Sequence, residues 1–386
     1  MRCAMDKPYL LQAIIYAGSS YRFFLGPRDS SINLVRIQSY HETLKHVREA
    51  VEHLNGQPTD DLLLAVALLT MHGPPSYHLD PAKTDKEHYR DNDFYFTKPW
   101  EPSHFSALIS LTKMKGGPRY IAIPSVAAMV FIIDTVECFS TLRKPNFPIF
   151  VSPTFIFKSL RRSQSITRSP PGFQFLRNKA HGRTLLKIME KTNDVIENYD
   201  MFLQDPGCGV DLWNVIAARR VAQYQALSTE TNSDPLYTIC RLGVLVHLIE
   251  SLELLPAILP YHENASRQLM LAIDECDKLG YWHTQPDLML WATVLGGLTS
   301  RGRSLQWWFA EQLGGSAVPA TKASWEGVQE ISKRFIPFVH GHGEGCRRFW
   351  KQACDWLSGR PDAPTRAHLS TELEGTRSMP EHATHQ

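Results

Sequence analysis

Apolar residues recur at helical spacing along most of this chain, and the strict alternation of apolar and polar residues that marks a strand is scarce. The clearest stretch is 286–313, where Pro286 suits a first helical turn and Asp287 complements the positive end of a helix dipole. The apolar residues that follow lie on one helical pattern: Leu288, Trp291, Val294, Leu295 and Leu298. Gly302 ends this helix and a second one follows. The stretch therefore predicts two buried helices with almost no reactive side chains.

The same periodicity predicts about thirteen helices in total. In the first half of the chain they cover residues 10–24, 39–54, 61–71, 101–115 and 125–142. In the second half they cover 183–202, 211–228, 233–253, 261–279, 287–301, 305–313, 324–335 and 345–357. No repeat of about 30 to 50 residues occurs, which excludes a regular tetratricopeptide-type solenoid. We therefore expect an all-α fold, an irregular multi-helix array in two lobes.

The composition changes sharply between the two groups of helices. Residues 1–142 form the predicted N-terminal lobe and residues 183–357 the C-terminal lobe. The stretch 143–182 between them is rich in proline, serine and basic residues and contains no acidic side chain. We predict a basic linker or loop there, and a disordered tail over the polar residues 358–386.

The bulk composition narrows the function only a little. The chain has 386 residues, of which 43% are hydrophobic and 21% charged, with a formal net charge of +2. This net charge favours neither a polyanionic partner nor an acidic substrate. The seven cysteines are dispersed and contain no Cys-x-x-Cys pair, so neither a disulfide framework nor a zinc knuckle is predicted. The apolar stretches are too short to span a bilayer, and we expect a soluble intracellular protein without membrane contact.

Reactive residues form no recognisable catalytic motif, so no catalytic residue, no cofactor and no enzymatic activity are expected. The sequence lacks the glycine-rich nucleotide loops, the Gly-x-Ser-x-Gly turn of hydrolases and the His-Glu-x-x-His motif. One alternative is a helical metal-dependent enzyme whose site lies near His340-Gly341-His342-Gly343-Glu344-Gly345-Cys346 and the long loop 75–99. The three glycines there favour a mobile loop instead, and Gly345 serves equally well as punctuation before a helix.

The basic stretch 143–182 leaves a second alternative open. Arg161, Arg162 and Arg168 in it could contact phosphates, because Lys and Arg supply most of the sequence-independent affinity for nucleic acids. No folded recognition motif surrounds these residues. A solvated linker, a nuclear import segment or a phosphorylation segment would have the same composition.

Three passages, taken in order, carry a family resemblance. The first is an amphipathic helix followed by Thr59-Asp60-Asp61-Leu62-Leu63-Leu64-Ala65-Val66-Ala67-Leu68-Leu69, and the second is Trp100-x-x-x-His104-x-x-x-Leu108-x-x-Leu111 before Gly116-Gly117. The third pairs Cys240-Arg241-Leu242-Gly243-Val244-Leu245-Val246-His247-Leu248 with residues 286–309. In this order the chain resembles the regulatory domain of fungal-specific transcription factors, the helical region downstream of a zinc binuclear-cluster DNA-binding domain.

The resemblance implies a nuclear transcriptional regulator or co-regulator. Its implied partners are the transcription machinery or another regulator, a small-molecule effector and, as a homodimer, a second copy of the chain. Candidates for an effector pocket are large side chains with one polar handle, each of which plain core packing also explains: Trp100, His104, Trp291, Trp307 and Trp308. In that family six zinc-binding cysteines precede the domain, whereas here only Cys3 precedes Cys138. We therefore expect no zinc cluster and no direct DNA binding by this chain.

Overall fold

The computed structural model describes residues 5–26, 29–75, 101–161, 170–231, 233–250, 260–315, 324–338 and 340–357. Every regular element in these ranges is a helix, which confirms the predicted all-α class. The described helices outnumber the expected thirteen or so, because short α- and 3-10-helical segments lie between the long ones. Within the same ranges no helix is both long and apolar enough to cross a membrane.

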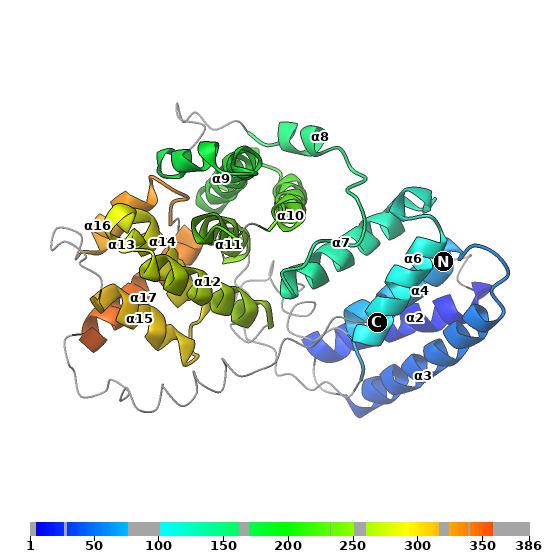
Figure 1. Ribbon diagram of the computed structural model, residues 1–386. Coiled ribbons are helices and arrows are strands. Elements are labelled where there is room, and N and C mark those ends of the chain that lie inside the picture. The colour runs from blue at the N-terminus through cyan, green and yellow to red at the C-terminus, as the bar shows by residue number, and fades with distance from the viewer. Residues whose placement is uncertain are drawn as a thin grey trace. The chain divides into compact units, whose positions relative to one another are not determined.

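The chain divides into two compact units, unit 1 (Met1–Phe155 with Glu253–Leu259) and unit 2 (Ile156–Leu252 with Pro260–Gln386). The helices of unit 1 are α2 (Pro8–Leu25), α3 (Ser30–Glu52), α4 (Asp60–His72), α6 (Pro102–Met114), the 3-10 helix η2 (Pro118–Tyr120) and α7 (Pro124–Ser140). Helix α8 (Pro153–Lys158) crosses the boundary between the units (Figure 1). The helices of unit 2 are η3 (Pro171–Asn178), α9 (Gly182–Gln204), α10 (Leu212–Ser228), α11 (Pro235–Glu250), α12 (Pro260–Lys278), α13 (Tyr281–Thr284), α14 (Pro286–Thr299), α15 (Leu305–Gly315), α16 (Trp325–Ser332) and α17 (His340–Leu357).

Unit 1 is built on the hairpin of α2 and α3, against which α4 packs, with α6 and α7 completing the core. Thr59 caps α4, since its side chain accepts a hydrogen bond from the backbone N–H of Leu62 at 3.2 Å. Helix α3 begins at Ser30, well before the expected residue 39. Asp29 explains the earlier start, because its carboxylate accepts from the backbone N–H of Ser31 at 2.8 Å.

Helix α14 lies at the centre of unit 2, with α11, α12, α15 and α17 packed around it (Figure 1). All residues from Leu288 to Thr299 are buried, so this helix has no solvent-facing side after its first turn. The sequence prediction of a buried helix over this stretch is thereby confirmed. A helix that is apolar all round is stable in water only when other elements enclose it completely.

Glycines make room for aromatic rings around α14. A Cβ atom built on Gly297 would lie 2.1 Å from the ring of Phe349, and one on Gly296 would lie 2.1 Å from the ring of Phe309. On the facing helix α11, a Cβ on Gly243 would lie 2.3 Å from the Trp291 ring. Real Cβ atoms do not approach other atoms this closely, so any larger residue would force these rings out of place.

Helix α17 corrects the expectation about the glycine-rich segment. The sequence predicts a mobile loop before residue 345, but the helix already begins at His340 and runs through the glycines. A Cβ on Gly345 would lie 2.6 Å from Cδ1 of Leu298. Gly345 therefore permits close packing of α17 on α14 and does not mark the start of the helix.

Part of the stretch expected to be a basic linker packs into unit 2. In η3, Phe173 and Leu176 are fully buried, and the Phe173 ring meets Trp291 edge-on with 5.4 Å between the ring centroids. The backbone N–H of Gly172 donates to the carbonyl of Arg334 at 2.6 Å. Residues 170–178 therefore pack into unit 2 through buried apolar contacts and do not form a solvated linker. The tail expected at 358–386 lies outside the described residues.

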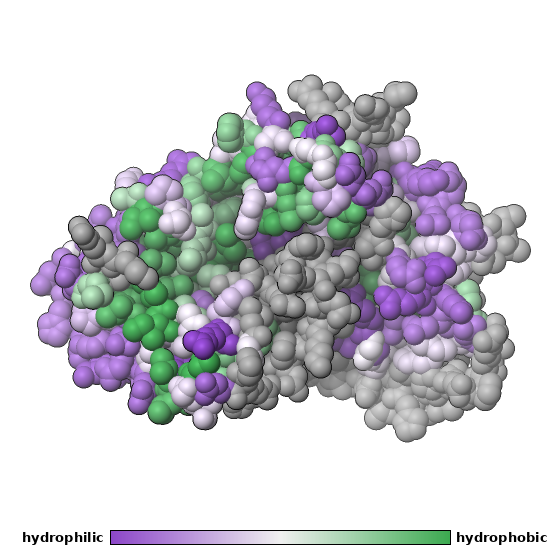
Figure 2. All heavy atoms as spheres, turned by 180° about the vertical axis from the view of Figure 1, so that it is seen from behind, coloured by the Kyte–Doolittle hydropathy of each residue, from purple (hydrophilic) through white to green (hydrophobic). Residues whose placement is uncertain are grey.

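Some large apolar side chains reach the surface, and green side chains are visible on the face shown in Figure 2. In unit 1 they include Leu34 and Val35 of α3 and Ile14 of α2. Such exposure is ordinary for a folded protein, because polar atoms alone do not cover a protein surface.

Replacement of Gly297 by alanine tests the packing of α14. We expect Gly297→Ala to lower the free energy of unfolding by about 1–3 kcal/mol, because the added methyl group overpacks against Phe349. Gly18→Ala in α2 is the matched control, since a Cβ there meets no atom within 4 Å, and it should be neutral or stabilising by up to about 1 kcal/mol. Denaturant unfolding followed by circular dichroism gives both values. Equal stability of Gly297→Ala and the parent chain would contradict this packing.

Candidate functional site

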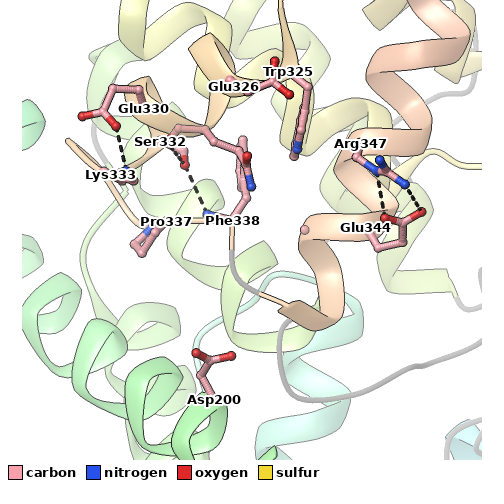
Figure 3. A pocket seen from close by; sticks show the side chains of 12 residues that line it. Asp200, Trp325, Glu326, Glu330, Ser332, Lys333, Pro337, Phe338, Glu344 and Arg347 are labelled. Atoms are coloured by element: carbon pink, nitrogen blue, oxygen red, sulfur yellow. Dashed lines mark hydrogen bonds and ion pairs between the residues drawn. The ribbon is translucent and has the colours of Figure 1, made fainter. Parts of the chain in front are cut away.

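A concavity of about 650 Å³ opens in unit 2 between α16, the segment 333–338 and the first turns of α17 (Figure 3). This volume falls in the range of about 300–1,000 Å³ that is typical of small-molecule sites. Its lining consists of Asp200, Trp325, Glu326, Gln329, Glu330, Ser332, Lys333, Pro337, Phe338, Gly343, Glu344 and Arg347. We refer to it as the α16–α17 pocket.

Hydrogen bonds to two serines shape the wall of the α16–α17 pocket. Ser324 caps α16, since its hydroxyl accepts from the backbone N–H of Gly327 at 3.2 Å. At the other end of α16, the hydroxyl of Ser332 accepts from the backbone N–H of Phe338 at 3.3 Å, a bond drawn in Figure 3. The turn after α16 is thereby closed, and the Phe338 ring is held against the pocket wall.

The charged residues of the pocket are mostly paired along their own helices. Lys333 lies 2.7 Å from Glu330, and Arg347 lies 2.9 Å from Glu344. These four side chains are at least half exposed, so their ion pairs add little stability. The lining also contains Asp200 and Glu326, and carboxylates therefore outnumber cations in it.

A row of parallel rings connects the pocket wall with α14. The Trp325 ring stacks on Phe338 with 6.2 Å between centroids, Phe338 on His247 with 5.8 Å, and His247 on Trp291 with 5.4 Å. The interplanar angles are 12°, 16° and 17°. Trp291 also donates its Nε1–H to the carbonyl of Ile336 at 3.1 Å, within the segment that forms the pocket wall. We call Trp325, Phe338, His247 and Trp291 the aromatic column.

A buried ionic cluster joins three helix ends on another side of α14. Glu250, at the end of α11, lies 2.8 Å from Nε2 of His262 at the start of α12 and 2.7 Å from Nη1 of Arg301 just after α14. The Glu250 side chain is only 4% exposed. Burial acts to raise its pKa, but the charges of His262 and Arg301 and their hydrogen bonds outweigh burial and hold the pKa at about 2. The cluster therefore keeps Glu250 ionised in the folded protein.

The effector-pocket candidates from the sequence fall into different places. Trp100 lies outside the described residues. His104 lies half-buried in unit 1, where its Nε2 is 3.2 Å from the Tyr40 hydroxyl. Burial lowers the pKa of His104, and the charge of Glu101 acts against this. A hydrogen-bonded structural histidine accounts for this geometry.

The other three candidates lie in unit 2, and none belongs to the lining of the α16–α17 pocket. Trp291 is fully buried on α14 and is linked to the pocket wall through the aromatic column and through its hydrogen bond to the Ile336 carbonyl. Trp307 stacks on Trp356 of α17, and Trp308 meets Phe309 edge-on. Two lining residues, Gly343 and Glu344, belong to the segment 340–346 that the sequence marked as a candidate metal site. Trp325 and Phe338 belong to no motif in the sequence that would have pointed to them.

In the segment considered for a metal site, the described candidate ligands are Glu344 and Cys346. Glu344 pairs with Arg347, and Cys346 is fully buried, where burial raises the pKa of its thiol well above the ordinary value. The side chains of His340 and His342 are not among those described. Within the described residues no group of three or more His, Cys, Asp or Glu side chains could hold a metal ion.

The basic stretch is described only in part. The backbone N–H of Arg161 donates to Oδ1 of Asn198 at 2.8 Å, and the amide of Asn198 donates back to the Arg161 carbonyl at 2.9 Å. This pair of bonds fixes the backbone of Arg161 along α9. Arg162 and Arg168 belong to the residues that the structure does not describe.

Comparison with family models, curated proteins and solved structures found no match to the chain. The resemblance to fungal regulatory domains thus stays a prediction from the three sequence passages.

The pH dependence of stability tests the buried ionic cluster. We expect Glu250→Gln to lower the free energy of unfolding by about 3 kcal/mol at neutral pH, because it leaves a buried partner of the ion pair uncompensated. The pKa of Glu250 is depressed from 4.5 to about 2 on folding, so its contribution is complete above pH 4.5 and is lost as the pH falls towards 2. The stability difference between parent and variant should therefore narrow over that interval.

Glu275→Gln is the control, because Glu275 is 55% exposed in a surface pair with Lys278 on α12. Urea unfolding at several pH values between 7 and the acid limit of folding provides the comparison. A difference for Glu250→Gln that stays constant down to the acid transition would contradict the assignment.

Proposed function

We propose that this protein is a transcriptional regulator or co-regulator of the nucleus, with no catalytic activity of its own. The observation that carries the proposal is the α16–α17 pocket, whose aromatic wall is stacked through Phe338 and His247 onto the buried helix α14. A pocket coupled to a helical core is what an effector-responsive regulatory domain requires. The three sequence passages that resemble fungal regulatory domains add independent support.

The mechanism that we propose is a shift between two packings of the helices. A ligand or partner side chain in the pocket would contact Trp325 and Phe338 directly. Any movement of Phe338 must be accommodated by His247, because close-packed interiors transmit displacement instead of absorbing it. A ligand that binds one packing more tightly than the other would then change the population of α14 arrangements. The response would reach other helices through the contacts of α14.

The division of this helical array into an N-terminal and a C-terminal lobe, with bounds near residues 1–142 and 183–357, remains part of the proposal. We infer that the chain reaches DNA through a partner, which would be another regulator or a component of the transcription machinery. We also propose that the chain pairs with a second copy of itself, as the resemblance implies; such a homodimer would still need another regulator to reach DNA.

A tethering assay tests the proposed function. The chain is fused to an unrelated DNA-binding domain, and transcription of a reporter carrying the cognate sites is compared with that of the DNA-binding domain alone. We expect a change in reporter transcription of several-fold under at least one growth condition. Trp325→Ala should reduce this response, because it removes one wall of the pocket.

Trp213→Ala is the matched control for this assay, because Trp213 on α10 is 78% exposed and is not part of the pocket lining. Both variants should be expressed and folded as judged by circular dichroism. Unchanged transcription across varied conditions would contradict the proposed function. An equal loss of the response in both variants would show that the response does not depend on the pocket.

A further inference from the structure

The guanidinium group of Arg36 is an unusual feature of unit 1. Arg36 lies on α3, in the interface with α2, and only 4% of the residue is exposed. Its Nη2 donates to the carbonyl of Pro75 at 2.6 Å, and its Cζ lies 4.3 Å from the centre of the Phe23 ring. Its Nε has no hydrogen-bond partner, and no carboxylate of the described residues forms an ion pair with it. Arg36 is therefore a buried cation without an anion among these residues.

Another buried arginine shows what complete pairing looks like in this protein. Arg241 in unit 2 is 6% exposed, and its Nε donates to the carbonyl of Ala226 and to the hydroxyl of Thr229, both at 3.0 Å. Its Nη2 donates to the carbonyl of Leu227 at 3.3 Å. Arg241 thus caps the end of α10 with several hydrogen bonds. Arg36 is buried as deeply, but its guanidinium group makes fewer hydrogen bonds than that of Arg241.

Burying an unpaired charge is costly, since neither the protein nor water replaces the lost hydration. The face of Phe23 and the carbonyl of Pro75 offset part of this cost for Arg36. Neither of them carries a full negative charge. A ligand that supplies one would therefore gain both a charge-assisted hydrogen bond to Nε and the electrostatic energy of pairing.

The neighbours of Arg36 are also suited to a polar ligand. The amide oxygen of Asn33, one turn earlier on α3, is buried and has no hydrogen-bond partner. Rotation of this amide about the Cβ–Cγ bond would exchange the oxygen for the NH2 group, so that a donor replaces the acceptor at that position. Tyr16 lies close enough for the charge of Arg36 to act on its hydroxyl, whose pKa burial raises well above the ordinary value. The α2–α3 interface thus holds both a cation and unsatisfied hydrogen-bonding capacity.

We propose that Arg36 is the centre of a binding site for a small oxyanion, a carboxylate or a phosphate, at the α2–α3 interface. The planar guanidinium group with a free Nε edge is the side chain best suited to such ligands. The opposing explanation is that Arg36 only caps the chain after α4, through its bond to the Pro75 carbonyl. This site is independent of the α16–α17 pocket and of the proposed role in transcription.

The experiment measures anion-linked stability of the full chain. Thermal unfolding is followed with increasing inorganic phosphate, with increasing acetate, and with chloride at matched ionic strength as the reference. A ligand that binds only the folded state raises the unfolding temperature in proportion to the logarithm of its concentration above Kd. We expect such a rise with at least one of the two oxyanions, and their comparison distinguishes a phosphate site from a carboxylate site. Equilibrium dialysis with labelled phosphate or acetate gives the affinity directly.

Variants then locate the effect. Arg36→Met should weaken oxyanion binding by about tenfold or more, since hydrogen bonds to charged groups are the strong ones, and it should leave the chain without anion at least as stable as the parent. Arg36→Lys keeps the charge without the planar fork and should retain part of the binding. Arg241→Met is the control, which should be less stable at every anion concentration while keeping the parent's anion dependence.

Two results would overturn the proposal. The first is a parent chain whose unfolding temperature responds to phosphate and acetate no more than to chloride. The second is Arg36→Met with unchanged anion binding, or with a loss of stability like that of Arg241→Met and no anion dependence in the parent, which would make Arg36 a cap only. If Arg36→Met does not fold, the parent and Arg36→Lys measurements still decide the question.

Discussion

The complete burial of α14 is the constraint on which the rest of unit 2 depends. A helix whose residues are apolar on every side has to be enclosed, and each enclosing helix must approach closely enough to exclude water. Gly243, Gly296 and Gly297 make that approach possible, because each leaves space that an aromatic ring fills. Each of these glycines lowers the helix propensity at its position, but it allows the neighbouring helix to pack closely.

Charged groups hold α14 at both ends, one pair at the start of the helix and a buried pair after its last turn. Asp287 in the first turn pairs with Arg334, which follows α16. After the last turn, Arg301 pairs with the buried Glu250 of α11. Between these ends, Trp291 lies in the aromatic column and binds the carbonyl of Ile336. The segment that forms the pocket wall is therefore attached to α14 at two points, Arg334 and Ile336.

The sequence predicted the fold class and most helices well, because apolar periodicity and capping residues are local signals. Thr59 and the proline at the start of α14 marked helix ends where the structure has them. Gly345 was misread, since the reason for a glycine inside α17 is its distance to Leu298, a contact between residues far apart in the chain. The burial of Phe173 in η3 depends in the same way on Trp291 and Phe335.

The pocket and the charged groups were harder to predict than the helices. Trp325 and Phe338 come together only when the turn after α16 closes, and neither belongs to a motif. Glu250 belongs to no motif in the sequence, and its partners are His262 on α12 and Arg301 just after α14. A site built from several elements gives little signal within any one of them. Trp291, Trp307 and Trp308, which stood out in the sequence, lie outside the pocket lining, and Trp100 lies outside the described residues.

The central claim is that the α16–α17 pocket and α14 respond as one unit, and a double-mutant cycle between Trp325→Ala and Trp291→Phe tests it most directly. The two side chains are joined through Phe338 and His247, and Trp291 also binds the segment that carries Phe338. The account predicts that their effects on the free energy of unfolding are non-additive by about 1 kcal/mol. Effects that add to within about 0.3 kcal/mol would contradict it, because the pocket wall and α14 would then be independent.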